Sequence, residues 1–382
     1  MGTHIDMFSM KMSKRWQDRF GVIHALILCC CILVACGGKR VTDPALDDLD
    51  EVEDENELLS SYSNRIQVVP TMNSSFNDSN TVHCANIEYL WSALASNSDK
   101  SIRENALAKE FDQSTSWKNS MDLSKLILAF GKPSDVYESI VQQYDEKYEI
   151  DKSDLSPQGS TFWGYTAKVV SYRYAEPFDE QRLIFLGEEV SAFGFNSESM
   201  STFVKEHFKD QFDVLYYNTD GEFVVKLKPA NTTDEIILTM INKRGTFLEM
   251  FNATKKLIEK GASEEKLNRY IFNLNAEDEL IIPVIRFNAR REYTEVKGLE
   301  FSSKYGPVDV LEQDLNFSFD RKGVVLDATV QMADSTGMPQ KPKLLHFNKP
   351  FYLYIKERKA SHPYFNVWVS DVEILQKKKK AN

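Results

Sequence analysis

Cysteine, glycine and proline are scarce in this chain of 382 residues, which has 5 Cys, 16 Gly and 12 Pro. Such a composition excludes collagen-like proteins and small disulfide frameworks. Four of the five cysteines fall within the first forty residues, so the rest of the chain carries a single thiol, Cys84, and cannot form an internal disulfide. Stability must therefore come from a core, and a hydrophobic fraction of 42% is enough to fill one.

Basic residues are outnumbered, because 46 Lys and Arg face 57 Asp and Glu and leave a net charge of −11. A nucleic-acid binder has a basic footprint, so we expect no nucleic-acid partner.

Catalytic signatures are also missing. The sequence has no Gly-x-Ser-x-Gly elbow, no His-Glu-x-x-His pair, no phosphate loop and no dinucleotide fingerprint. His83 beside Cys84 is a weak metal candidate, for which packing is the simpler interpretation. We therefore expect no enzyme activity, no metal and no cofactor.

The N-terminus has the pattern of an export signal. Four basic residues, the first of them Lys11, precede an apolar run from Val22 to Ala35 that is short for a membrane span. The run ends in Leu-Val-Ala-Cys-Gly-Gly, with the cysteine at position 36, and resembles the lipobox of bacterial lipoproteins. That resemblance implies cleavage before Cys36, a lipid on its sulfur, and a folded domain outside the cytoplasm at a bacterial membrane. The alternative is an uncleaved signal anchor with an incidental cysteine.

The remaining chain divides by composition. Residues 36–82 are acidic and polar, with nine carboxylates between Asp43 and Glu57, which predicts an extended tether. An acidic arm that binds a partner is the alternative. We expect a single domain over residues 83–376 and a solvated basic tail over residues 377–382, for which contact with a membrane surface is the alternative.

Periodicity and turn signals predict an α+β fold, with helices first and antiparallel strands later. Helices are expected at about 87–94, at 122–130 with Gly131 and Pro133 as stop signals, and at 246–260 with a stop at Gly261 and a cap for the next helix at Ser263. Strands are expected at 167–174, 183–186, 212–217, 223–227, 236–241, 280–287, 315–319, 351–355 and 365–374.

The C-terminal half resembles the serpin family. A strand from Leu315 ends in Asp-Arg-Lys-Gly at positions 320–323, and a polar stretch then leads to Phe-Asn-Lys-Pro-Phe at positions 347–351, about two dozen residues after the glycine. Ile-Pro-Val-Ile-Arg-Phe at 282–287 and the hairpin at 223–240 are similar to further serpin strands. The resemblance covers roughly residues 212–374. The Ser-Pro-x-Ser-Ile shutter motif is absent, and the stretch between Tyr293 and Leu315 is short.

This resemblance implies a serpin-like α+β fold, with N-terminal helices, large mixed and antiparallel sheets and a reactive-centre-type loop at about 323–346. A serine or cysteine protease would cleave the loop, and its hinge would insert into a sheet as a new strand. The implied hinge residues are Gly323, Val324, Leu326, Ala328 and Val330. The implied scissile region holds Gly337, Met338, Pro339 and Lys341.

The hinge also predicts that inhibition is slow or lost, because Val324 and Leu326 are bulky for inserting positions and prolines follow two candidate bonds. One alternative is a non-inhibitory binding or structural surface lipoprotein of the same α+β fold. Another is an unrelated α+β domain with a long hairpin loop. We expect a monomer whose partners are a protease and, through the lipid anchor, a membrane.

Overall fold

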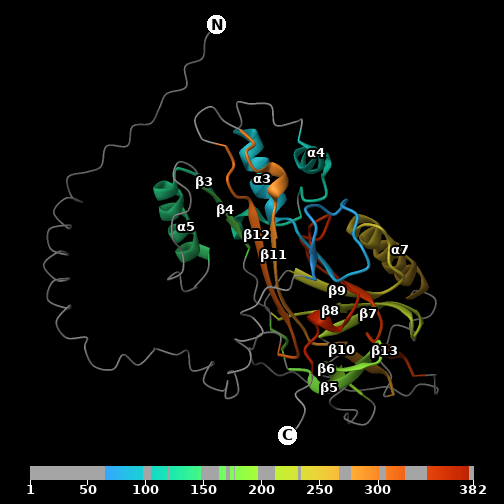
Figure 1. Ribbon diagram of the computed structural model, residues 1–382. Coiled ribbons are helices and arrows are strands. Elements are labelled where there is room, and N and C mark those ends of the chain that lie inside the picture. Colours follow the sequence, from blue (N-terminus) through green and yellow to red (C-terminus); the bar gives the residue numbers. More distant parts are fainter. Residues whose placement is uncertain are drawn as a thin grey trace, which may run out of the picture. The chain divides into compact units, whose positions relative to one another are not determined.

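The computed structural model describes residues 65–97, 105–118, 120–147, 163–168, 173–175, 177–196, 211–230, 234–265, 277–300, 307–322 and 342–377 (Figure 1). All of them lie in the unit Asn56–Asn382. Across these ranges, no helix combines the length and the apolar character needed to cross a membrane.

The largest sheet formed by the described residues has seven strands. In spatial order they are β1 (Gln67–Val68), β2 (Thr81–Cys84), β15 (Phe365–Val369), β14 (Phe351–Glu357), β9 (Asp234–Met240), β8 (Glu222–Leu227) and β7 (Phe212–Thr219). Each neighbouring pair is antiparallel except β1 with β2. Strand side chains alternate between faces, and both faces of β14 are buried. Leu353 enters one hydrophobic cluster while Tyr352 and Tyr354 enter another, beneath helix α7 (Phe247–Glu265).

A four-stranded sheet has the order β13 (Leu344–His346), β10 (Glu279–Pro283), β6 (Glu188–Phe195) and β5 (Asp179–Phe185). β13 runs parallel to β10, and the other pairs are antiparallel. Two smaller sheets pair β11 (Ile285–Glu292) with β12 (Glu312–Phe319), and β3 (Ile127–Gly131) with β4 (Trp163–Ala167).

Among the described residues, three other α-helices belong to the N-terminal half: α3 (Asn86–Ser96), α4 (Ala106–Gln113) and α5 (Pro133–Lys147). The side chain of Asn105 accepts the backbone N–H of Ala108 and caps α4. Short 3₁₀ turns occur at Leu123–Lys125, Thr294–Val296 and Val372–Ile374. The combination of helices, three of which precede residue 148, with mostly antiparallel sheets confirms the predicted α+β class.

One predicted helix is wrong. Residues 122–130 form a 3₁₀ turn followed by β3, because their continuous apolar run suits a buried strand as well as a helix. Pro133 is not a stop signal but the first residue of α5, where its missing N–H costs no hydrogen bond.

Other boundaries also differ from the predictions. Helix α7 runs past Gly261 to Glu265 and includes Ser263, so Gly261 is not a stop and Ser263 is not a cap. Of the strand predicted at 167–174, Ala167 is the last residue of β4, and residues 169–172 lie outside the described residues. The strand predicted at 365–374 ends at Val369, before the 3₁₀ turn.

Residues 66–82, predicted as part of the tether, belong to the fold. β1 pairs with β2, and Val69, Met72 and Phe76 are buried under α7. The apolar residues of this stretch are few and spread among polar ones, which is why its sequence predicts a spacer. At the other end, Lys377 forms an isolated bridge with Val190, so the predicted tail is attached at its first residue.

Candidate functional site

Strand β12 leads to one end of the segment 323–341, which lies outside the described residues. Gln313, Leu315 and Phe319 point into the protein, and the side chains between them are partly or fully exposed. Among the described residues, β11 is the only strand that pairs with β12. Within that part of the chain, the second edge of β12 therefore offers backbone groups to a further strand.

The turn after β12 is held from two sides. The Asp320 carboxylate accepts the backbone N–H of Lys322 at 2.9 Å and the Arg286 Nη2 at 3.1 Å. The Arg321 carbonyl accepts the backbone N–H of Phe178 at 3.0 Å. These contacts hold the chain up to Lys322, the last described residue before the segment.

Lys343 stands at the other end of the segment and is buried, with 4% of its surface exposed. Its Nζ lies 2.5 Å from Asp278 Oδ2, and its backbone N–H donates to Asp278 Oδ1 at 2.7 Å. Its carbonyl accepts the backbone N–H of Glu279 at 2.9 Å. Separating this pair would leave two charges unpaired in the protein interior, which is costly.

A second carboxylate fastens the next residue. Asp220, in the turn between β7 and β8, accepts the Tyr217 hydroxyl at 2.5 Å and the backbone N–H of Leu344 at 3.3 Å. Burial, followed by the hydrogen bond to Asp220, raises the pKa of Tyr217. Asp278 and Asp220 thus hold two consecutive residues, Lys343 and Leu344, at the start of β13.

The motif Phe347–Phe351 forms the turn from β13 into β14. The Phe347 ring meets those of Phe223 and Phe351 edge-on, with centroids 5.0 and 5.1 Å apart. The Asn348 carbonyl accepts the backbone N–H of Leu186 at 3.3 Å. Both phenylalanines of the motif are therefore core residues that fix the chain beyond the segment.

The residues that the sequence assigned to the loop and the lipid site lie outside the described residues. They are Cys36, Gly323, Val324, Leu326, Ala328, Val330, Gly337, Met338, Pro339 and Lys341. The structure places the two chain ends that flank residues 323–341, and the roles of these ten residues stay predictions.

A buried polar network that the sequence did not predict joins β2, α3, β14 and β15. His83 Nε2 lies 3.0 Å from Glu88 Oε2, and His83 Nδ1 lies 3.0 Å from Asn366 Nδ2. Glu88 Oε1 accepts the Ser114 hydroxyl at 2.6 Å, and Asn366 Oδ1 accepts the Tyr352 hydroxyl at 2.5 Å. Because the Asn366 nitrogen is a donor, Nδ1 of His83 accepts and its Nε2 carries the proton toward Glu88.

His83 and Cys84 are thus packed into the core. Both ring nitrogens of His83 have protein partners, and no cluster of His, Cys, Asp and Glu suited to a metal occurs in the described part of the chain. Burial raises the pKa of Cys84 to about 11. In the sequence, only Glu88 pointed to this network, because it is an acidic residue next to Ile87, on the apolar side of an amphipathic helix.

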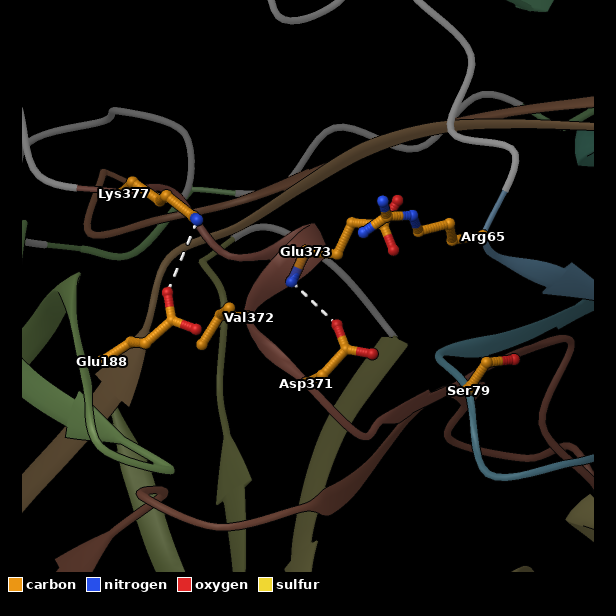
Figure 2. Close-up of a pocket in the computed structure, with 7 residues that line it drawn as sticks. All are labelled: Arg65, Ser79, Glu188, Asp371, Val372, Glu373 and Lys377. Carbon is orange, nitrogen blue, oxygen red and sulfur yellow. Dashed lines mark hydrogen bonds and ion pairs between the residues drawn. The ribbon is translucent and has the colours of Figure 1, made fainter.

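Figure 2 shows a pocket of about 460 Å³ near the start of β1 and the last 3₁₀ turn. It is lined by Arg65, Ser79, Glu188, Asp371, Val372, Glu373 and Lys377. Lys377 Nζ lies 3.5 Å from Glu188 Oε2, and Asp371 Oδ1 accepts the backbone N–H of Glu373 at 2.8 Å. Asp371 Oδ1 also accepts the side-chain amide of Asn80 at 2.7 Å, so this carboxylate is engaged within the protein.

Solved structures similar to this chain are serpins. The native state of a thermophilic serpin, tengpin, is 12% identical, with a TM-score of 0.42 over 78% of this chain and 90% of tengpin. Maspin is 11% identical, with a TM-score of 0.45 over 76% of this chain and 92% of maspin. The mouse protein-Z-dependent protease inhibitor is 11% identical, with a TM-score of 0.41 over 76% of this chain and 91% of the inhibitor.

No protein-family model matches the sequence, and no curated protein matches it. The identities and TM-scores are too low to carry a residue role or an activity from the serpins to this chain. The resemblance of this chain to serpins at the level of residues therefore rests on the motifs of its own sequence.

Proposed function

We propose that this chain is a serpin-like surface protein that inhibits serine-type endopeptidases through cleavage and insertion of a loop at about 323–346. The observation that carries the proposal is the attachment of segment 323–341. The segment begins after the turn that follows β12, whose second edge has no partner strand among the described residues, and it ends two residues before β13, which belongs to another sheet. Its far end is fixed by the motif Phe347–Phe351.

In the proposed mechanism, a protease cuts the loop and residues 324–332 insert beside β12. Side chains of a strand alternate between its two faces, and β12 follows that alternation. The inserting segment has the same pattern, which only Val325 breaks. Its apolar residues are Val324, Leu326, Ala328, Val330 and Met332, and the polar residues between them are Asp327, Thr329 and Gln331.

The hinge sequence supports slow insertion. Overpacking by bulky residues such as Leu326 costs about 1–3 kcal/mol, which slows a step by roughly 10- to 100-fold. Pro339 and Pro342 follow two of the candidate bonds and lack the backbone N–H that an extended substrate offers a protease. These features favour a second candidate function, in which the fold serves binding or structure at the surface without insertion.

Incubation with trypsin-, elastase- and subtilisin-like proteases tests inhibition in the chain that lacks residues 1–36. We expect an SDS-stable covalent complex, formed slowly. The control is Ala328→Arg, which places a charge where the inserted strand would be buried and is expected to be cleaved without forming a complex. Clean cleavage of the unmutated chain without a complex would contradict inhibition.

Insertion has a second readout that does not depend on the protease. Cleavage of the loop should raise the melting temperature, because a new strand adds to the sheet beside β12. An unchanged melting temperature after loop cleavage would favour the binding or structural function.

We also propose that Cys36 carries a lipid, that the folded domain lies outside the cytoplasm, and that the protein is not an enzyme. The support for the first two is the signal pattern of residues 1–38, and the support for the third is the lack of catalytic motifs in the sequence.

A further inference from the structure

Lys343 has its backbone groups and its side chain engaged at the end of the loop. Asp278 accepts both its backbone N–H and its Nζ, and the backbone N–H of Glu279 donates to its carbonyl. The next backbone N–H, that of Leu344, donates to Asp220. Asp278 is fully buried, so solvent does not compete for the charge pair.

A protease binds its substrate as an extended strand on both sides of the scissile bond, through backbone hydrogen bonds. For the bond Lys341–Pro342, the second residue after the cut is Lys343. Its backbone groups are already bonded within the protein, so the protease can bind there only after this part of the chain opens locally.

We propose that Asp278 clamps Lys343 and thereby removes Lys341–Pro342 from the bonds that a protease can cut. Proline after the bond also disfavours cleavage of Met338–Pro339. Asp278 thus influences which bond is cut by holding Lys343 in place, without touching the protease. The inference rests on the proposed function only in taking the segment 323–341 as the part that proteases attack.

The variant Pro342→Ala distinguishes protection by the Asp278–Lys343 contact from protection by the proline, because it removes only the proline. With a lysine-specific, trypsin-like protease, this variant should stay resistant at Lys341, because the clamp is intact. The double variant Pro342→Ala/Asp278→Ala should be hydrolysed there about 100-fold faster, since cleavage follows the population of the locally open state. Mass spectrometry identifies the fragment whose new N-terminus is position 342, which forms when water adds across the peptide bond.

The matched control removes a different buried ion pair. Lys168 Nζ lies 2.8 Å from Glu357 Oε1, and 4% and 12% of the two side chains are exposed. Pro342→Ala/Glu357→Ala should lose stability but remain resistant at Lys341. If it is cleaved at Lys341 as fast as the Asp278 double variant, or if Pro342→Ala alone is cleaved that fast, the clamp is refuted.

Hydrogen exchange of the unmutated chain keeps the proposal testable if Asp278→Ala prevents folding. The backbone amides of Lys343 and Leu344 should exchange slowly, and rapid exchange of both would overturn the clamp. The cut position is read separately from complex formation. A missing covalent complex would therefore refute the proposed inhibition. The positions of cleavage would still show whether Asp278 protects the bond Lys341–Pro342.

Discussion

Glu88 links three parts of the chain through one buried carboxylate. Its oxygens accept hydrogen bonds from His83 and Ser114, and only 1% of its surface is exposed. Removing a buried acceptor leaves its donors without partners, which costs more than the hydrogen bonds themselves contribute.

Glu88→Ala is expected to lower the free energy of unfolding by about 3 kcal/mol. Urea denaturation followed by tryptophan fluorescence measures the change. Glu88→Gln, which keeps the shape and one acceptor oxygen, should lose less. An alanine variant as stable as the unmutated chain would show that the network contributes nothing to stability.

Cys84 provides a second test of the core at the scale of the residue. Because burial raises the pKa of its thiol to about 11, the thiol stays neutral and covered at pH 8. In the chain that lacks residues 1–36, which has no other cysteine, a thiol reagent should label Cys84 only after unfolding. The variant Cys84→Ala gives the background, and rapid labelling under native conditions would contradict the described burial.

At the scale of the element, α7 approaches β7 so closely that one position excludes a side chain. A Cβ added at Gly261 would lie 1.9 Å from the Leu215 carbonyl oxygen. Helix propensity alone predicts that alanine at a helical glycine adds about 1 kcal/mol of stability. The contact with β7 predicts the opposite sign, because either the helix or the strand must move.

Gly261→Ala is therefore expected to destabilise the protein by about 1–3 kcal/mol, the usual cost of overpacking. Thermal unfolding by circular dichroism measures the effect. Ala262→Gly on the same helix serves as the control for propensity, with an expected loss of about 1 kcal/mol. A stabilised Gly261→Ala variant would mean that α7 is not packed this closely.

Prediction from the sequence worked best where local signals agree. The hairpin β7–β8 was predicted because Asp220-Gly221 separates two apolar runs, and α3 because its apolar residues recur at helical spacing. β3 was mistaken for a helix because a short apolar run of four or five residues fits either element. Gly261 was mistaken for a helix end because glycine needed for close packing looks the same as glycine that stops a helix.

The candidate site was predictable only in part. The motif Phe347–Phe351 pointed to the end of the loop, and the structure places it at a turn into a buried strand. The pair Asp278–Lys343 was not foreseen, because its members are 65 positions apart and meet only through the parallel pairing of β10 with β13. A pairing of this kind depends on topology, which one sequence does not reveal.

At the scale of the whole molecule, the proposed lipid on Cys36 decides whether the protein is bound to a membrane or free in solution. Cys36→Ser is expected to move the protein from the detergent phase to the aqueous phase in Triton X-114 partitioning, because a lipid supplies the membrane affinity. The control is Cys31→Ser, which lies in the signal segment and should leave partitioning unchanged. Retention of Cys36→Ser in the detergent phase would favour the signal anchor.

The short strand β1 is expected to detach first when the chain is pulled from its N-terminal side, because only two of its residues pair with β2. Two backbone hydrogen bonds of 2.9 Å, from Gln67 to Asn80 and from Val69 to Val82, carry such a load first. Burial of Met72 and Phe76 then resists further extension. A pull on the N-terminal segment is therefore expected to detach residues 67–80 before it reaches β2. The chain would lengthen by this stretch while the sheet stays paired from β2 onward.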